Sequence, residues 1–220
     1  MQRKSQINLF FDCDGVILDS NSIKTKAFRE VLNNENEELV EEFIYYHQKN
    51  QGIDRFKKLD FFFNTIKKDF NHKEYILALK KYSKLCRVNL KKSNLVSGIE
   101  NFLIDANKKN HSCFVISGSE QNELRNVLKF KKLDKYFKGI YGSPLSKVEN
   151  IKKVLLKNYI NCNDIFFGDA KSDMKAAEET NLKFIYISEY SDWSEGLQFC
   201  RKNNLKTYRN FIEVIKAYII

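Results

Sequence analysis

The chain has 220 residues and a formal net charge of +10, from 38 lysines and arginines against 28 acidic residues. This length allows one well-buried core and leaves room for a substantial insertion. The sequence contains no apolar run long enough to cross a bilayer, and its start lacks a signal-like region. We therefore expect a cytoplasmic protein that has no membrane partner.

The positive charge favours acidic partners, which include nucleic acid, an anionic membrane and a phosphorylated metabolite. The lysines are scattered along the chain, without a nucleic-acid-binding motif or an aromatic-basic repeat. Such a distribution is typical of a solvated surface. We therefore expect no nucleic acid, and a small phosphorylated substrate remains one of the possible acidic partners. The oligomeric state is left open, with a monomer as the expectation.

Short apolar runs alternate with segments of helical spacing along most of the chain. Runs typical of buried strands occur at 7–11, 113–116, 139–141, 165–167 and 184–187. Helical patterns occur at 99–109, 121–130, 148–158 and 173–180. The alternation predicts an α/β fold with a doubly wound parallel sheet.

One region departs from this alternation. Between the first and second runs, only helical patterns are found, at 23–32, 37–47, 56–66 and 74–88. We therefore predict an all-helical insertion at 20–91 and an α/β core made of 1–19 and 92–220. No linker rich in proline or glycine marks these boundaries, and Pro144 is the only proline in the chain.

Polar residues close several of the apolar runs. In an open parallel sheet, ligands bind beyond the carboxyl ends of the strands, so these residues should converge. They are Asp12 and Asp14 after the first run, Ser117 and Gly118 after the second, and Asp169 and Asp173 after the fourth.

Carboxylates this close require a positive charge among them. Two unit charges about 4 Å apart repel by on the order of 4 kcal/mol at an effective dielectric constant near 20. Oxygen ligands without clustered histidines or paired thiols suit magnesium better than zinc. Lys147, at the start of a helical pattern, adds a fixed cation.

A free carboxylate beside such cations can attack phosphorus and form an aspartyl-phosphate. Asp12 would be this nucleophile. Asp14 could then protonate the leaving oxygen and later take a proton from water. Ser117 and the backbone N–H groups around Gly118 could hold phosphate oxygens. Each motif alone is more often an ordinary turn or helix cap, but together and in this order they favour phosphoryl transfer.

At these residues the chain resembles the haloacid dehalogenase superfamily. Residues 10–20 (FFDCDGVILDS) match its first motif, 116–119 (ISGS) the second, Lys147 within 142–147 the third, and 168–173 (GDAKSD) the fourth. The helical insertion falls where members with a type 1 (C1) cap carry theirs. The resemblance is to capped phosphatases such as phosphoglycolate phosphatases and beta-phosphoglucomutase-like proteins.

The resemblance implies a Rossmann-like core with a helical cap. It also implies Asp12 as nucleophile, Asp14 as acid and base, and Ser117 and Lys147 on the phosphate. Mg²⁺ would be held by Asp12, the Asp14 backbone carbonyl and Asp169. Asp173 would support the metal through water or pair with Lys147. Dehalogenases of the superfamily lack an acid at the position of Asp14, so this residue favours a phosphatase.

A cap reads the part of the substrate away from the phosphate. Arg55, in a segment similar to the loop that faces the active site in capped phosphatases, is our first candidate for substrate contact. The alternative is an ordinary ion-pair arginine. Asn21 and Lys24 are further candidates. The segments 19–21 and 52–58 are similar to phosphatases of bacterial surface-polysaccharide (capsule) and nucleotide-sugar pathways, which suggests a sugar phosphate or a related intermediate.

Two other functions stay open at this stage. A phosphomutase of the beta-phosphoglucomutase type would use the same aspartyl-phosphate but return the phosphate to another hydroxyl. A non-catalytic basic module would bind nucleic acid in a salt-sensitive way. The complete set of Asp12, Asp14, Lys147 and Asp169 argues against the second.

Overall fold

The computed structural model describes residues 6–157 and 163–217. Six parallel strands form one sheet in the order β3-β2-β1-β4-β5-β6. The strands are β1 (Asn8–Phe11), β2 (Ser112–Glu120), β3 (Gly139–Ser143), β4 (Ile165–Gly168), β5 (Lys183–Ile187) and β6 (Lys206–Tyr208). The prediction of a doubly wound α/β fold is confirmed.

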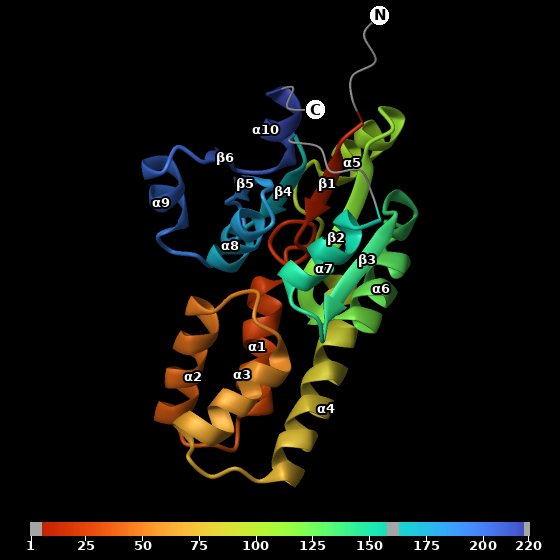
Figure 1. Cartoon of the computed structure of the whole chain (residues 1–220). Coiled ribbons are helices and arrows are strands. Elements are labelled where there is room, and N and C mark those ends of the chain that lie inside the picture. The colour runs from red at the N-terminus through yellow and green to blue at the C-terminus, as the bar shows by residue number, and fades with distance from the viewer. Residues whose placement is uncertain (1–5, 158–162, 218–220) are drawn as a thin grey trace, which may run out of the picture.

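Helices cover both faces of this sheet and also form a separate group (Figure 1). The helices beside the sheet are α5 (Ile99–Lys108), α6 (Gln121–Phe130), α7 (Lys147–Leu155), α8 (Lys171–Glu179), α9 (Gly196–Lys202) and α10 (Phe211–Lys216). The separate group comprises α1 (Asn21–Val31), α2 (Glu37–Lys49), α3 (Arg55–Phe61), the π-helix η1 (Phe62–Ile66) and α4 (His72–Asn89). Short 3-10 turns lie at η2 (Leu90–Lys92) and η3 (Asp134–Tyr136).

The central strand β1 is apolar and fully buried, as expected for a strand covered on both faces. Neighbouring side chains in a strand point to opposite faces. Phe11 accordingly packs with Phe102 of α5 and Phe211 of α10, while Phe10 packs on the side of α7, α8 and α9. The chain leaves β1 toward β2 on one side and reaches β4 on the other, so the switch point lies between β1 and β4.

The helices α1 to α4 lie beyond the carboxyl ends of the strands, toward which the strand arrows point (Figure 1). Aromatic contacts hold them together: Phe28 packs against Phe43 and Tyr82, with ring centroids 5.2 and 4.1 Å apart. The single helix expected at 56–66 is instead α3 followed by η1. The wider π turn leaves Phe62 and Phe63 both buried.

Three elements near the C-terminal end were not predicted. β6 has three residues, each at least partly exposed, and therefore lacks the apolar run of a buried strand. α9 and α10 have seven and six residues, too few to display a helical period. The helix expected at 148–158 ends at Leu155, and its last expected residue lies outside the described part of the chain.

The division into a core and a cap at 20–91 stays a prediction. Among the described residues, no helix combines the length and the apolar character that a membrane span requires.

Candidate active site

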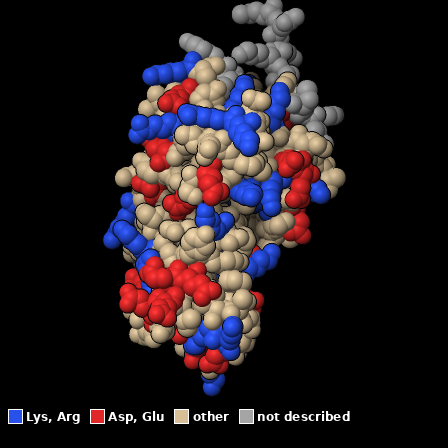
Figure 2. Space-filling model, turned by 90° about the vertical axis from the view of Figure 1, so that its left-hand side faces the viewer, with Lys and Arg blue, Asp and Glu red and all other residues tan. Residues whose placement is uncertain are grey.

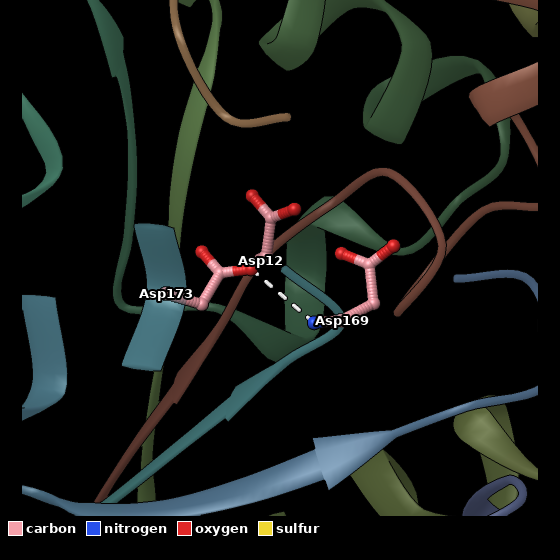
Figure 3. Close-up of side chains that lie close together, drawn as sticks. All are labelled: Asp12, Asp169 and Asp173. Atoms are coloured by element: carbon pink, nitrogen blue, oxygen red, sulfur yellow. Dashed lines mark hydrogen bonds between the residues drawn. The ribbon is translucent and has the colours of Figure 1, made fainter. Parts of the chain in front are cut away.

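Three buried carboxylates meet at the switch point of the sheet. Asp12 directly follows β1, Asp169 directly follows β4, and Asp173 lies in the first turn of α8. One oxygen from each lies within 4.8 Å of the others. Figure 3 shows the three side chains close together, Asp12 and Asp169 beyond the ends of β1 and β4 and Asp173 on α8. The strand ends, far apart in sequence, therefore form one acidic cluster.

Backbone hydrogen bonds fix the carboxylate of Asp173 and the main chain of Asp12. Asp173 Oδ2 accepts hydrogen bonds from the backbone N–H groups of Asp169 and Ala170, at 3.2 and 3.1 Å. These contacts place the carboxylate at the helix N-terminus, where unpaired N–H groups favour negative charge. The backbone N–H of Asp12 donates to the carbonyl of Phe167 at 2.9 Å, which fixes β1 beside β4.

Lys147, the first residue of α7, supplies the cation that neutralises part of this cluster. Its ammonium lies 2.9 Å from Asp12 Oδ1 and also bonds to Asp173. Burial raises the pKa of Asp12 to about 7; Lys147 opposes that rise and Asp173 adds to it. Burial also raises the pKa of Asp169 well above its usual value, followed by the charge of Asp12.

Three carboxylates with one lysine leave a surplus of negative charge. Asp12 Oδ1 is buried and faces Lys147 at ion-pair distance, and none of the described residues donates a hydrogen bond to it. All three acids are almost wholly buried, with oxygen as the available ligand atom. These residues fit a hard divalent cation such as Mg²⁺, which prefers carboxylate oxygens and would relieve their repulsion.

Asp14 lies in a different set of contacts. It accepts hydrogen bonds from Ser20 Oγ at 2.6 Å and from Ser119 Oγ at 3.0 Å, and it pairs with the Lys24 ammonium. Burial favours a raised pKa for Asp14, but Lys24 and these hydrogen bonds outweigh burial and lower it. The Asp14 side chain is therefore held ionised, apart from the cluster of three acids.

A small cavity of about 40 Å³ joins these groups. Ser117 and Gly118, near the end of β2, line it, and Ser117 Oγ accepts a hydrogen bond from the backbone N–H of Ser119 at 3.1 Å. Asp12, Asp14 and Asp169 line the same cavity. The ends of β2 and β4 thus lie on either side of the Asp12 carboxylate, which is the convergence that the sequence predicts.

The loop between α2 and α3 closes over this cavity. Gly52 adopts a positive φ of +81°, and a Cβ there would lie 2.2 Å from Ser172 Oγ and 3.2 Å from the Lys147 ammonium. A Cβ at Gly118 would lie 2.3 Å from the carbonyl oxygen of Gly52. Only glycine fits at both places. Entry of a substrate larger than the cavity therefore requires this loop to move.

The candidate substrate residues of the helical segment line the cavity too, but each already has protein partners. Asn21 Nδ2 donates to Asp169 Oδ2 at 2.8 Å and to the carbonyl of Tyr190 at 2.9 Å. Arg55 forms a two-pronged ion pair with Glu123 of α6, at 2.9 and 2.6 Å, and lies over the Tyr82 ring. The ion-pair alternative for Arg55 thus has a partner; substrate contact by Asn21, Lys24 and Arg55 stays a prediction.

Among the residues that line this cavity, Ser119, His47 and Lys58 were not identified from the sequence. Ser119 lies two residues after Ser117, on the same side of an extended segment, and that spacing could have revealed it. His47 and Lys58 come from α2 and α3 and also line the cavity. No local pattern indicated them, because their position depends on how the helices pack.

Comparisons with known proteins agree with this architecture. A family model described as haloacid dehalogenase-like hydrolase matches residues 9–187. A search of curated proteins found no match.

Solved structures with the same fold cover nearly the whole chain. A predicted phosphatase from Clostridium acetobutylicum has 22% identity and a TM-score of 0.75, covering 98% of this chain and 99% of its own. A predicted phosphoglycolate phosphatase from Haemophilus somnus 129PT has 15% identity, a TM-score of 0.77 and the same coverage of both chains. A beta-phosphoglucomutase from Clostridium difficile has 21% identity and a TM-score of 0.76, covering 98% and 97%. With the family model matching most of its length, the chain belongs to the haloacid dehalogenase-like hydrolases.

Proposed function

We propose that this hydrolase is a Mg²⁺-dependent phosphatase that releases phosphate from a small metabolite through an aspartyl-phosphate on Asp12. One observation carries the proposal. The buried Asp12 carboxylate lies 2.9 Å from Lys147 and within 4.8 Å of two more carboxylates, while Asp14 has separate partners. This arrangement provides a nucleophile, charge neutralisation and a second, independent carboxylate.

In the first step, a carboxylate oxygen of Asp12 attacks phosphorus and the bond to the leaving oxygen breaks. Asp14 gives that oxygen a proton. Asp14 is ionised while Lys24 pairs with it, and burial alone favours its protonated form. Withdrawal of Lys24 would therefore allow Asp14 to take up the proton. In the second step, the ionised Asp14 takes a proton from the water that attacks phosphorus and frees Asp12.

The remaining groups hold the phosphate. Ser117 and the backbone N–H groups around Gly118 would bind its oxygens, together with Lys147. Asp12, the Asp14 backbone carbonyl and Asp169 would hold Mg²⁺, and Asp173 would support it through water while it holds Lys147. The ion would neutralise phosphate oxygens.

The natural substrate that we propose is a sugar phosphate or a phosphorylated intermediate of polysaccharide or nucleotide-sugar metabolism, handled by a cytoplasmic monomer. Residues 20–91 would act as its cap. On the face seen in Figure 2, basic side chains are interleaved with acidic ones on the upper part. A group of acidic side chains lies on the lower part, beside a smaller basic group. The helix α2 carries the exposed Glu37, Glu38, Glu41 and Glu42. This distribution supports a metabolite better than nucleic acid.

The test is release of free phosphate from sugar phosphates, amino-alcohol phosphates, nucleotide-sugar derivatives and nucleotides, with and without Mg²⁺. We expect Mg²⁺-dependent release from one class and none by Asp12→Asn. Conversion of one sugar phosphate into another without free phosphate would indicate a phosphomutase. Salt-sensitive binding of nucleic acid without any hydrolysis would contradict the proposal.

A further inference from the structure

The cavity contains a buried lysine that the proposed chemistry does not use. Lys58 of α3 is 2% exposed, and its ammonium lies 2.7 Å from His47 Nδ1 and 3.3 Å from the His47 carbonyl oxygen. His47 is equally buried; burial, and then the charge of Lys58, lower its pKa well below the usual value. The ring is therefore neutral, with Nδ1 as acceptor and Nε2 directed at Thr25 Oγ1, 3.1 Å away.

Lys58 differs from the other cations that line this cavity. Lys24 pairs with Asp14, and Arg55 pairs with Glu123. Lys58 has no carboxylate within ion-pair distance in the described ranges 6–157 and 163–217. Burying an ammonium without a counter-ion is costly. Burial, followed by the charge of Lys24, lowers the pKa of Lys58 to about 7.

The position of Lys58 indicates which part of a substrate it would meet. It approaches the cavity from the helical side, whereas Asp12 and Ser117 approach from the strand ends. The transferred phosphate already has candidate partners at the strand ends. An anion that reaches Lys58 would therefore belong to the rest of the substrate.

We infer that Lys58 selects substrates that carry a second anionic group, a carboxylate or another phosphate, and that His47 aims its ammonium at that group. The inference rests on the proposed phosphatase function and narrows its substrate class. The neutral His47 ring supplies a hydrogen-bond acceptor without cancelling the lysine charge. The second anion of the substrate would supply the counter-ion that the protein lacks.

The test compares substrates that differ in one anionic group. One pair is 3-phosphoglycerate and glycerol 3-phosphate, which tests a carboxylate; the other is fructose 1,6-bisphosphate and fructose 6-phosphate, which tests a phosphate. We expect the wild-type enzyme to prefer the more anionic member of at least one pair in kcat/KM. Lys58→Met should reduce that preference by about 10- to 100-fold, mainly through KM, because a charge-assisted hydrogen bond is lost.

Lys57→Met is the matched control, since Lys57 is the next residue of α3 and its side chain is 73% exposed. It should leave the preference unchanged. The ratio of two substrates measured on one sample does not depend on the fraction of folded enzyme, so a loss of stability cannot imitate the result. Lys58→Gln serves as a second variant that removes the charge but keeps a polar group.

A wild-type enzyme without preference in either pair would overturn the inference. So would a preference that survives in both Lys58 variants, because Lys58 would then only pack against His47. In either case, Mg²⁺-dependent hydrolysis of p-nitrophenyl phosphate would show that the phosphatase itself is intact. Absence of that hydrolysis would instead contradict the proposed function and this inference with it.

Discussion

The strand ends and the helices α1 to α4 place their charged residues by different means. At the strand ends, Asp12 and Asp169 follow neighbouring parallel strands, and the sheet alone brings them together. In the helices, Arg55 and Lys58 lie one turn apart on α3, yet Arg55 pairs with Glu123, whereas Lys58 contacts His47. Sheet topology thus positions the carboxylates of the cluster, whereas helix packing decides which partners the cations of the helices acquire.

The two regions also meet directly. Gly52 lies close to Gly118. Lys24 forms an ion pair with Asp14, and Arg55 forms one with Glu123. The helical segment therefore contributes both the closure of the cavity and the partner that keeps Asp14 ionised. A change at these contacts should therefore affect both regions.

The largest effect is expected at the strand ends. Asp12→Asn should reduce kcat by on the order of 10⁴-fold or more, because the proposed aspartyl-phosphate forms on the Asp12 carboxylate. The measurement is phosphate release, with circular dichroism to show that the variant is folded. Asp105→Asn, at a half-exposed aspartate of α5, is the control and should behave as wild type. Near-native activity of Asp12→Asn would rule out the covalent intermediate.

The next effect concerns the ion pair that joins the helices to the sheet. Arg55→Met should lower the free energy of unfolding by about 3–5 kcal/mol, because Glu123 is left as a buried, unpaired charge. Adding Glu123→Leu should recover much of that loss, and urea unfolding of the single and double variants measures the coupling. Arg29→Met, which breaks the exposed pair with Glu41, should change stability far less. Equal losses in both pairs would mean that burial of the Arg55 pair has no special consequence.

A metal at the three carboxylates should stabilise the fold. Mg²⁺ at 100 times its dissociation constant adds about 2.7 kcal/mol, which corresponds to a rise in Tm of roughly 5–10 °C for a chain of this size. Asp169→Asn should remove most of this rise, whereas Asp105→Asn should keep it. A Tm that is unaffected by Mg²⁺ in the wild-type protein would contradict the assignment of the site.

The smallest expected effect is a change of the free energy of unfolding with pH, caused by the titration of Lys58. Its pKa in the folded protein, about 7, lies below the ordinary lysine value of 10.5. Above pH 7 the unfolded chain binds the additional proton, so the contribution of Lys58 to stability rises with pH, by at most about 1.4 kcal/mol per unit. The groups whose charges act on it are Lys24, Asp14, Lys147 and Asp54.

Urea unfolding between pH 7 and 9 measures this dependence. The stability of the wild-type protein should rise relative to that of Lys58→Met as the pH increases. The Lys57→Met control should follow the wild type. A constant difference between wild type and Lys58→Met would mean that Lys58 titrates normally despite its burial.

The sequence by itself determined the α/β class, five of the six strands and the residues that gather at their ends. Buried parallel strands are continuous apolar runs, and their carboxyl ends lie at one edge, so Asp12, Ser117 and Asp169 could be placed together without knowing any distance. β6 was not predicted, because this short edge strand has no such apolar run.

Only the tertiary structure decided the partners of the helical segment. The pairs Arg55–Glu123, Lys24–Asp14 and Lys58–His47 join residues 68, 10 and 11 positions apart. Helical periodicity shows which face of a helix is apolar, but the rotation and crossing of packed helices depend on how many side chains fit together at once. The sequence therefore indicated the reaction, and packing determined which lysine of the cavity has no carboxylate partner within the described part of the chain.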